Sequence, residues 1–249
     1  MSVLIGLIAG LFGGLVGLGG GVVMIPLMVG VLRVGQHKAH GTSLVALVFT
    51  GIAGAITYAT KGAVDITASV LIAVTAIFTA RAGARFAHAL AEWKLKRSFG
   101  AFLIIVSLLL LMKPYLSHIS QPAEGWTKIT VLLLTGVFTG FLSGMLGVGG
   151  GTIMVPAMVL LAGFSQHTAQ GTSLLAMIPA GGVGAFTHLR LGNVEVKLIP
   201  GLIPGILVGT FLGGTLAQIL SETVLRIVFA VVLIWTGVKY LKAPSAAKS

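Results

Sequence analysis

Two glycine-rich blocks are the residues of this sequence whose type and spacing best suit ligand binding. Gly17-Leu-Gly19-Gly20-Gly21 is followed by Pro26, and Gly147-Val-Gly149-Gly150-Gly151 is followed by Pro156. A glycine run that ends one half-helix and starts another exposes backbone N–H groups at a positive helix end, which can bind an anion without a basic side chain. The expected substrate-binding glycines are Gly17, Gly19, Gly20, Gly21, Gly147, Gly149, Gly150 and Gly151. Small residues four apart also allow close helix packing, and we assign Gly6 and Gly10 to that role.

Two hydroxyl pairs follow the glycine blocks, in Gly41-Thr42-Ser43 and Gly171-Thr172-Ser173. Each pair opens an apolar run, so the hydroxyls can act as helix N-caps that satisfy free N–H groups. Alternatively, they face the glycine break and add a second helix N-terminus from each half to an anion site. Thr42, Ser43, Thr172 and Ser173 are therefore candidate substrate-binding residues.

Three other kinds of polar residue could contact a substrate. Gln36-His37 and Gln166-His167 lie in the short connections before the hydroxyl pairs, as exposed loop residues or as protonatable contacts to an anion. Arg81 is placed to lie inside a span, where an arginine is functional by default, but it could also extend to the cytoplasmic face. Asp65 and Glu195 are expected to cap the helices that follow them.

Several chemistries are excluded by residues that the sequence lacks. It has no cysteine, so disulfides, thiolate metal sites and cysteine nucleophiles are absent. It also has no His-Glu-x-x-His cluster and no Gly-x-Ser-x-Gly elbow. The glycine blocks lack the strand–turn–helix context and the acidic residue of a dinucleotide site. We therefore expect no enzyme activity, no metal and no cofactor.

The composition indicates an integral membrane protein. The 249 residues are 56% hydrophobic and only 8% charged, whereas soluble domains carry about 25% charged residues. The net charge of +11 comes from Lys and Arg between apolar segments, where they orient a membrane protein rather than bind nucleic acid. The expected partners are the lipid bilayer and a small anion, with no nucleic acid, and a homodimer is left open.

The chain contains its pattern twice, at a shift of 130 positions. The shift superimposes the glycine blocks, the Gln-His pairs and the Gly-Thr-Ser-Leu motifs, and it places Asp65 on Glu195. Apolar runs and breakers give four segments in each half: residues 2–32, 42–60, 66–85 and 98–116, then 127–162, 172–189, 196–220 and 224–241. The first segment of each half is too long for one span and is broken by the glycines and then by Pro26 or Pro156. It is either a discontinuous crossing helix or a re-entrant hairpin.

The distribution of basic residues favours the hairpin. A crossing segment would put eight Lys and Arg on each side of the membrane, which gives no orientation signal. With a hairpin, each half makes three crossings, the halves are inverted, and twelve basic residues share one face, a normal positive-inside bias. Those twelve are Arg33, Lys38, Arg81, Arg85, Lys94, Lys96, Arg97, Arg190, Lys197, Lys239, Lys242 and Lys248, opposed by Lys61, Lys113, Lys128 and Arg226.

The expected fold is therefore an all-α integral membrane protein of two inverted structural repeats, each a broken or re-entrant helix hairpin plus three transmembrane helices. Residues 1–116 form the first repeat, 117–126 the linker and 127–249 the second repeat. Both termini and the loop of residues 82–97 are expected in the cytoplasm, and the linker outside. Membrane proteins built from two such repeats are often transporters, and their substrate site lies where the two repeats meet.

The doubled glycine block, the Gly-Thr-Ser-Leu motifs and the Gly192-Asn-Val-Glu195 turn resemble the sulfite exporter TauE/SafE family of membrane transporters. The resemblance covers about residues 10–241. It implies a secondary transporter in the cytoplasmic membrane that moves sulfite, sulfonates such as sulfoacetate, or related small anions outward. The first half departs from the family pattern at Lys61-Gly62-Ala63 and in having Arg81. A passive small-anion channel is the alternative function.

Overall fold

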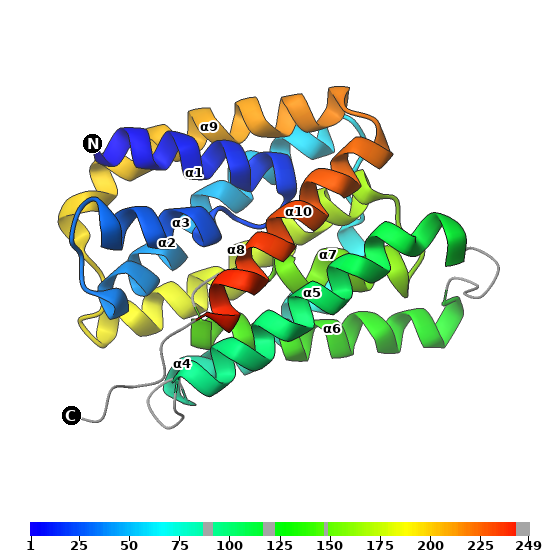
Figure 1. The fold of residues 1–249 in the computed structure, drawn as a ribbon, viewed down its shortest axis with the longest axis horizontal. Helices are drawn as coiled ribbons and strands as arrows, with labels where there is room; N and C mark the ends of the chain where they lie inside the picture. The colour runs from blue at the N-terminus through cyan, green and yellow to red at the C-terminus, as the bar shows by residue number, and fades with distance from the viewer. Residues whose placement is uncertain (87–91, 117–122, 147–148, 243–249) are drawn as a thin grey trace.

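The computed structural model describes residues 1–86, 92–116, 123–146 and 149–242. These residues fold into α-helices joined by short connections, with one 3-10 turn, as expected for an all-α protein (Figure 1). The helices are α1 (Ser2–Val16), α2 (Gly21–Gly30), α3 (Gln36–Ala59), α4 (Ile66–Phe86), α5 (Glu92–Leu116), α6 (Gly125–Leu146), α7 (Gly151–Leu160), α8 (Gln166–Arg190), α9 (Ile199–Ile219) and α10 (Glu222–Leu241). The 3-10 turn η1 (Val196–Leu198) leads into α9.

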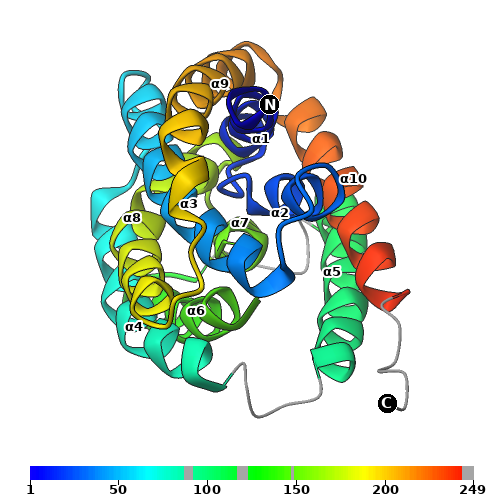
Figure 2. The ribbon, with the colours of Figure 1, turned by 90° about the vertical axis from the view of Figure 1, so that its left-hand side faces the viewer.

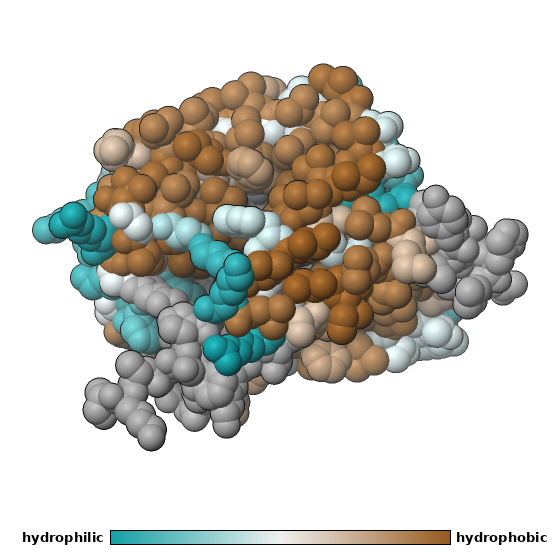
Figure 3. All heavy atoms as spheres, in the orientation of Figure 1, coloured by the Kyte–Doolittle hydropathy of each residue, from teal (hydrophilic) through white to brown (hydrophobic). Residues whose placement is uncertain are grey.

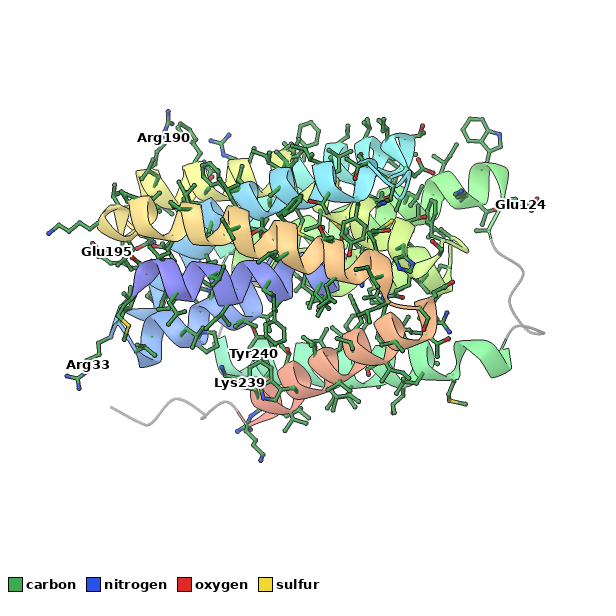
Figure 4. All side chains as sticks on the ribbon, turned by 90° about the horizontal axis from the view of Figure 1, so that it is seen from above. Arg33, Glu124, Arg190, Glu195, Lys239 and Tyr240 are labelled. Carbon is green, nitrogen blue, oxygen red and sulfur yellow. The ribbon has the colours of Figure 1, made fainter. Side chains whose placement is uncertain are left out.

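The long first segment of each half folds back as a hairpin. Helix α1 ends at the first glycine block and α2 returns, so that the N-terminus and Arg33 lie at the same end of the molecule (Figures 1 and 4). In the second half, the N–H of Ala123 before α6 donates to the carbonyl of Leu161 after α7 at 3.1 Å. The glycines break each segment as expected. Pro26 and Pro156 do not, since both lie inside continuous helices.

Basic residues gather at one end of the helix bundle. Figure 4 shows Arg33, Arg190 and Lys239 at the same end, with Glu195 beside them and Glu124 at the opposite end. This arrangement is the one required by the hairpin interpretation of the sequence, in which Arg33, Arg190 and Lys239 share a face.

Glycines allow two helix pairs to pack backbone against backbone. A Cβ at Gly6 or Gly10 of α1 would meet the carbonyl of Leu202 or Ile206 on α9, so their assignment to helix packing is confirmed. In the same way, a Cβ at Gly136 or Gly140 of α6 would meet the carbonyls of α4. Helices α3 and α8 pack together between these pairs, and α5 packs along α10 at one side (Figure 2).

The outer surface is suited to lipid. Large apolar side chains project from the helices, among them Phe78 of α4, which is 75% exposed. Hydrophobic residues cover most of the face shown in Figure 3, and hydrophilic residues gather toward the end that carries Arg33. Six helices of the described residues are long and apolar enough to span a membrane: α3, α4, α6, α8, α9 with η1, and α10. This set includes α6, which is the first helix of the second hairpin. Helix α5, expected as a span, is not in the set and contributes only the shorter apolar stretch Gly100–Met112.

Several predicted boundaries were wrong because polar residues extend the helices beyond their apolar cores. Helices α3 and α8 begin at Gln36 and Gln166, six residues before the expected spans. Residues 92–97, expected in a loop, form the start of α5, whereas residues 87–91 lie outside the described part. The expected linker of residues 117–126 gives its last two residues to α6, and residues 117–122 are likewise outside the described part.

Candidate functional site

Each glycine break joins the end of one helix to the start of another. In the first break, Gly17 ends α1 with φ 72°, and Gly19 and Gly20 have φ of 80° and 77°, a left-handed backbone that favours glycine. Helix α2 then begins at Gly21 without a side-chain cap. In the second break, Gly149 has φ 86° and Gly150 has φ −81° before the equally uncapped start of α7 at Gly151. Gly147 lies outside the described residues.

The structure brings the two breaks into contact at the centre of the bundle. A Cβ at Gly149 would lie 2.6 Å from the carbonyl oxygen of Leu18, and a Cβ at Gly151 would meet the carbonyl oxygen of Gly17. Leu47 of α3 and Met177 of α8, which are related by the 130-residue shift, line this contact. Both side chains adjoin Gly19 and are 1% exposed. The expected meeting of the two glycine blocks is thus present, in a tightly packed form.

Thr42 and Thr172 do not cap helices, so that interpretation was wrong. Gly35 and Ser165 occupy the N-cap positions of α3 and α8, and the Ser165 side chain accepts from the N–H of Thr168. Instead, Thr42 Oγ1 accepts from the backbone N–H of Glu195 at 2.8 Å, and Thr172 Oγ1 accepts from that of Asp65 at 2.9 Å. Each fully buried hydroxyl therefore holds a turn of the opposite half.

The acidic residues of these turns differ in role. Asp65 caps α4 as expected, since its Oδ1 accepts from the N–H of Ala68 at 2.9 Å. Glu195 has no side-chain capping bond and pairs with Lys38 of α3 at 2.9 Å, so its predicted capping role was wrong.

The serines and a tyrosine connect α3 and α8 to the end of α1. Ser173 Oγ lies 2.9 Å from the carbonyl oxygen of Gly17 and 2.8 Å from that of Gln170 in its own helix. Ser43 Oγ donates to the carbonyl of His40 at 2.7 Å. The hydroxyl of buried Tyr58 lies 3.0 Å from both the carbonyl oxygen of Gly14 and Gln170 Oε1. The carbonyl end of α1 therefore lies within hydrogen-bond distance of hydroxyl groups from α3 and α8.

The remaining candidates are not brought together. His37 is exposed at the start of α3, and His167 Nε2 lies 3.1 Å from the carbonyl of Ala217. The starts of α3 and α8 lie at opposite ends of this antiparallel pair, because Thr42 meets the turn after α8 and Thr172 meets the turn after α3. The expected four helix N-termini around one anion are therefore not assembled. Of Gln36, only the backbone is described.

Arg81 lies away from the breaks. It is exposed and shares a face of α4 with exposed Val74 and Phe78, seven and three residues before it. This position is compatible with a side chain that extends along the lipid-facing surface to the bundle end.

Four residues at the centre were missed by the sequence reasoning: Leu47, Tyr58, Gln170 and Met177. A useful signal was available for Leu47 and Met177, because the 130-residue shift relates them to each other just after the matched Gly-Thr-Ser-Leu motifs. No such signal exists for Tyr58 and Gln170, since their contact joins positions 112 residues apart.

Comparison with known proteins identifies related membrane transporters. The chain matches the family described as sulfite exporter TauE/SafE over residues 2–240. It is 28% identical to the probable membrane transporter protein YunE of Bacillus subtilis, over 95% of this chain and 97% of that protein. It is 31% identical to a probable membrane transporter protein of Xylella fastidiosa strain Temecula1, over 78% of this chain and 72% of that protein. No solved structure matches the chain significantly.

The apolar helices, the glycine hairpins and these relatives define a multi-pass membrane protein of a transporter class, not an enzyme. Within that class, the chain belongs to the sulfite exporter TauE/SafE family, as its glycine and Gly-Thr-Ser-Leu motifs indicate.

Proposed function

We propose that this protein is a secondary transporter that exports small sulfur-containing anions, such as sulfite, sulfoacetate or other organosulfonates, across the cytoplasmic membrane. The anion binds at the two glycine breaks, where the starts of α2 and α7 supply backbone N–H donors. The substrate class comes from the description of the family, and the choice of an anion is supported independently by the polar groups at the breaks.

The observation that carries this proposal is an imbalance between acceptors and donors at the breaks. The carbonyl end of α1 has side-chain donors nearby, because the Ser173 hydroxyl lies 2.9 Å from the carbonyl oxygen of Gly17 and the Tyr58 hydroxyl lies next to Gly14. In the described part of the chain, the N-cap positions of α2 and α7 are Gly20 and Gly150, which offer no side-chain acceptor to the first N–H groups of these helices. N–H donors at positive helix ends favour an anion over a cation.

The packing at the breaks suits the closed stage of a transport cycle. Leu47 and Met177 fill the space beside Gly19 and Gly149, and the breaks touch through their backbones. Binding of an anion between them requires α3 and α8 to shift relative to the hairpins. A site that opens to one side at a time by such a shift is the general mechanism of secondary transporters.

We also propose that residues 1–116 and 127–249 are inverted repeats, with both termini in the cytoplasm. Reciprocal contacts support this, since Thr42 bonds to Glu195 and Thr172 to Asp65, each pair being the other shifted by 130. The packing of α1 on α9 and α6 on α4 is reciprocal in the same way. Reporter fusions after Ser249 and within the linker should report opposite sides of the membrane. Fusions on the same side contradict the inverted arrangement.

Transport itself is tested with purified protein in proteoliposomes. Uptake of radiolabelled sulfite should saturate at low turnover and be competed by sulfoacetate more strongly than by chloride. Absence of sulfite and sulfonate transport by wild-type protein contradicts the proposed substrate class.

A passive small-anion channel is the second candidate. Among the described residues, the buried polar side chains are Ser, Thr, Gln and His, so no buried carboxylate is available there to carry a coupling proton. A channel needs no such group. Flux that rises linearly with sulfite concentration, and that a counter-gradient of protons or sodium leaves unchanged, identifies a channel.

A further inference from the structure

A cluster of partly buried charged groups joins α8 to α10 at the end of the bundle where both helices begin. Glu222 Oε1 accepts from the backbone N–H of Gln166 at 3.3 Å and from Arg226 Nη2 at 2.9 Å. One carboxylate oxygen therefore links the first turn of α8 to the guanidinium group. The Arg226 side chain is only 12% exposed, and its Nε has no hydrogen-bond acceptor among the described residues.

Two glutamines continue from this cluster into the protein. Gln166 and Gln170 are four residues apart on α8, so their side chains lie on the same face of the helix. Both are completely buried. Within the described part of the chain, neither the nitrogen nor the oxygen of the Gln166 amide has a partner, and Gln170 Nε2 has none either.

The orientation of the Gln170 amide does not remove its free donor. The Tyr58 hydroxyl has one hydrogen and lies 3.0 Å from both Gly14 O and Gln170 Oε1. If that hydrogen goes to Gly14, the amide of Gln170 turns and donates one N–H to the hydroxyl oxygen. The amide nitrogen carries two hydrogens, so at least one N–H remains unused in either orientation.

The inner end of this row of side chains reaches the first glycine break. A Cβ at Gly17 would lie 2.7 Å from the Cβ of Gln170, so nothing separates the glutamine from the break. The hydroxyl of Ser173, one turn further along α8, lies 2.9 Å from the carbonyl oxygen of Gly17. Arg226, Gln166 and Gln170, which we call the glutamine seam, therefore connect the bundle end to the proposed anion site.

Buried polar groups in native proteins almost always have hydrogen-bond partners, and a group without one requires an explanation. The unpartnered groups of the glutamine seam include an N–H donor from each of its three residues, and the donor of Arg226 belongs to a positively charged guanidinium group. Charge-assisted hydrogen bonds from such donors bind the oxygens of a small oxyanion. Glu222 offsets part of the Arg226 charge, which keeps binding weak enough for release.

We propose that the glutamine seam is a second binding position for the transported oxyanion, between the first glycine break and the end of the bundle that carries Glu124. It takes the sulfite ion or the sulfonate head group of a larger substrate. The identity of the anion rests on the proposed function. The seam lies toward the end of the bundle where α8 and α10 begin, and at the positions 130 residues earlier Gln36 matches Gln166 whereas His40 and Lys96 stand in place of Gln170 and Arg226.

Sided transport measurements test this position. Gln166→Met and Gln170→Met remove the amide donors with little change in side-chain volume. The half-saturating sulfite concentration is measured in right-side-out and everted membrane vesicles that contain each variant. Ser107→Ala is the matched control, because Ser107 is also fully buried but donates to the carbonyl of Ala230 between α5 and α10 and has its hydrogen bond satisfied.

Each Met variant should raise the half-saturating concentration about tenfold at the face next to the seam, the effect of one lost hydrogen bond. The change at the other face should be less than about twofold, and Ser107→Ala should match wild type at both. If a Met variant does not fold, Arg226→Lys provides the same test, since lysine can keep the pair with Glu222 but lacks Nε. Wild-type values at both faces for every folded seam variant overturn the second position and leave the proposed function intact. Absence of transport by wild-type protein overturns the proposed function and this position with it.

Discussion

The two glycine breaks have matching sequences but different backbone conformations. Gly19 and Gly20 both have left-handed φ in the first break, whereas in the second only Gly149 does and Gly150 has φ −81°. A residue with a Cβ is therefore excluded at Gly20 by its backbone, but at Gly150 only by its neighbours. The first break therefore needs the left-handed conformation at two glycines next to the start of its second helix, whereas the second break needs it at Gly149 and needs Gly150 mainly for space.

Alanine substitutions in the two breaks should have the largest effect of the changes considered, and the size of the effect should differ between the breaks. In Gly20→Ala, the left-handed backbone costs about 1–2 kcal/mol. The new Cβ would also lie 2.5 Å from the backbone oxygen of Ala9, which cannot move aside. In Gly150→Ala, the Cβ meets the side chains of Met154, which is flexible, and of Thr139, which must change its rotamer or move. We expect Gly20→Ala to lower the thermal unfolding temperature in detergent and reduce sulfite uptake more than tenfold, with a smaller loss for Gly150→Ala.

Gly30→Ala is the control for this pair, because Gly30 has an ordinary φ and, among the described residues, its Cβ position has no atom within 4 Å beyond its neighbours and its own helix backbone. It should behave as wild type. Equal losses for Gly20→Ala and Gly150→Ala would show that space, not backbone conformation, limits both breaks.

The next comparison is between the two turns that are each held by a threonine of the opposite half, the Glu195 turn by Thr42 and the Asp65 turn by Thr172. Thr42→Val and Thr172→Val keep the side-chain shape but leave the backbone N–H of Glu195 or Asp65 without its acceptor, at a cost of about 1–3 kcal/mol each. Thr172→Val should lose more stability than Thr42→Val. The Glu195 turn, which Thr42 holds, is also held by the ion pair with Lys38, whereas the Asp65 turn depends on Thr172. Unfolding in detergent measures the difference, and Thr→Ser at each position should retain most of the stability. A larger loss for Thr42→Val would mean that the ion pair contributes nothing to its turn.

The ion pair itself should have a small effect. Lys38 and Glu195 side chains are 50% and 26% exposed, and pairs of this kind contribute about 0.2–1 kcal/mol. Lys38→Thr introduces the residue found at the equivalent Thr168. Its stability loss should disappear near 1 M salt, where screening reduces the range of charge interactions to about 3 Å. A loss that persists at high salt would indicate packing by the lysine stem instead.

Arg81→Gln should have the smallest effect on transport. Because Arg81 is exposed beside Val74 and Phe78, its loss should leave the half-saturating sulfite concentration unchanged. An inactive Arg81→Gln protein with normal Thr and Ser variants would instead place an arginine clamp in the first half.

The sequence predicted the hairpins because their causes are local. Three adjacent glycines interrupt a helix wherever they occur, and the basic residues then leave only one arrangement with a charge bias. The cap of Asp65 on α4 was predictable for the same reason. The start of α3 was not, because its first turn is polar, has no side-chain cap and is held by the tertiary contact Lys38–Glu195. The start of α8 had a local signal in the N-cap Ser165, which was overlooked because the apolar run begins only later.

The candidate site was predicted only in part. The glycine blocks were found because they recur, and their contact at the centre follows from two hairpins that enter from opposite ends. The true partners of Thr42 and Thr172 could not be found, since a hydroxyl in a helix gives no sign of the backbone it will meet in another segment. The glutamine seam was missed for a related reason, as Gln170 reads in sequence as an ordinary polar residue of a helix start.

The packing of α1 on α9 has a consequence for the assembly of the protein in the cell. The carbonyls of Leu202 and Ile206 that Gly6 and Gly10 approach are made about two hundred residues later than those glycines. The first hairpin therefore leaves the ribosome long before its partner helix exists. Contacts of such sequence separation form late and slowly, which exposes a chain to misassembly. The packing of α1 is therefore completed only after α9 has been made.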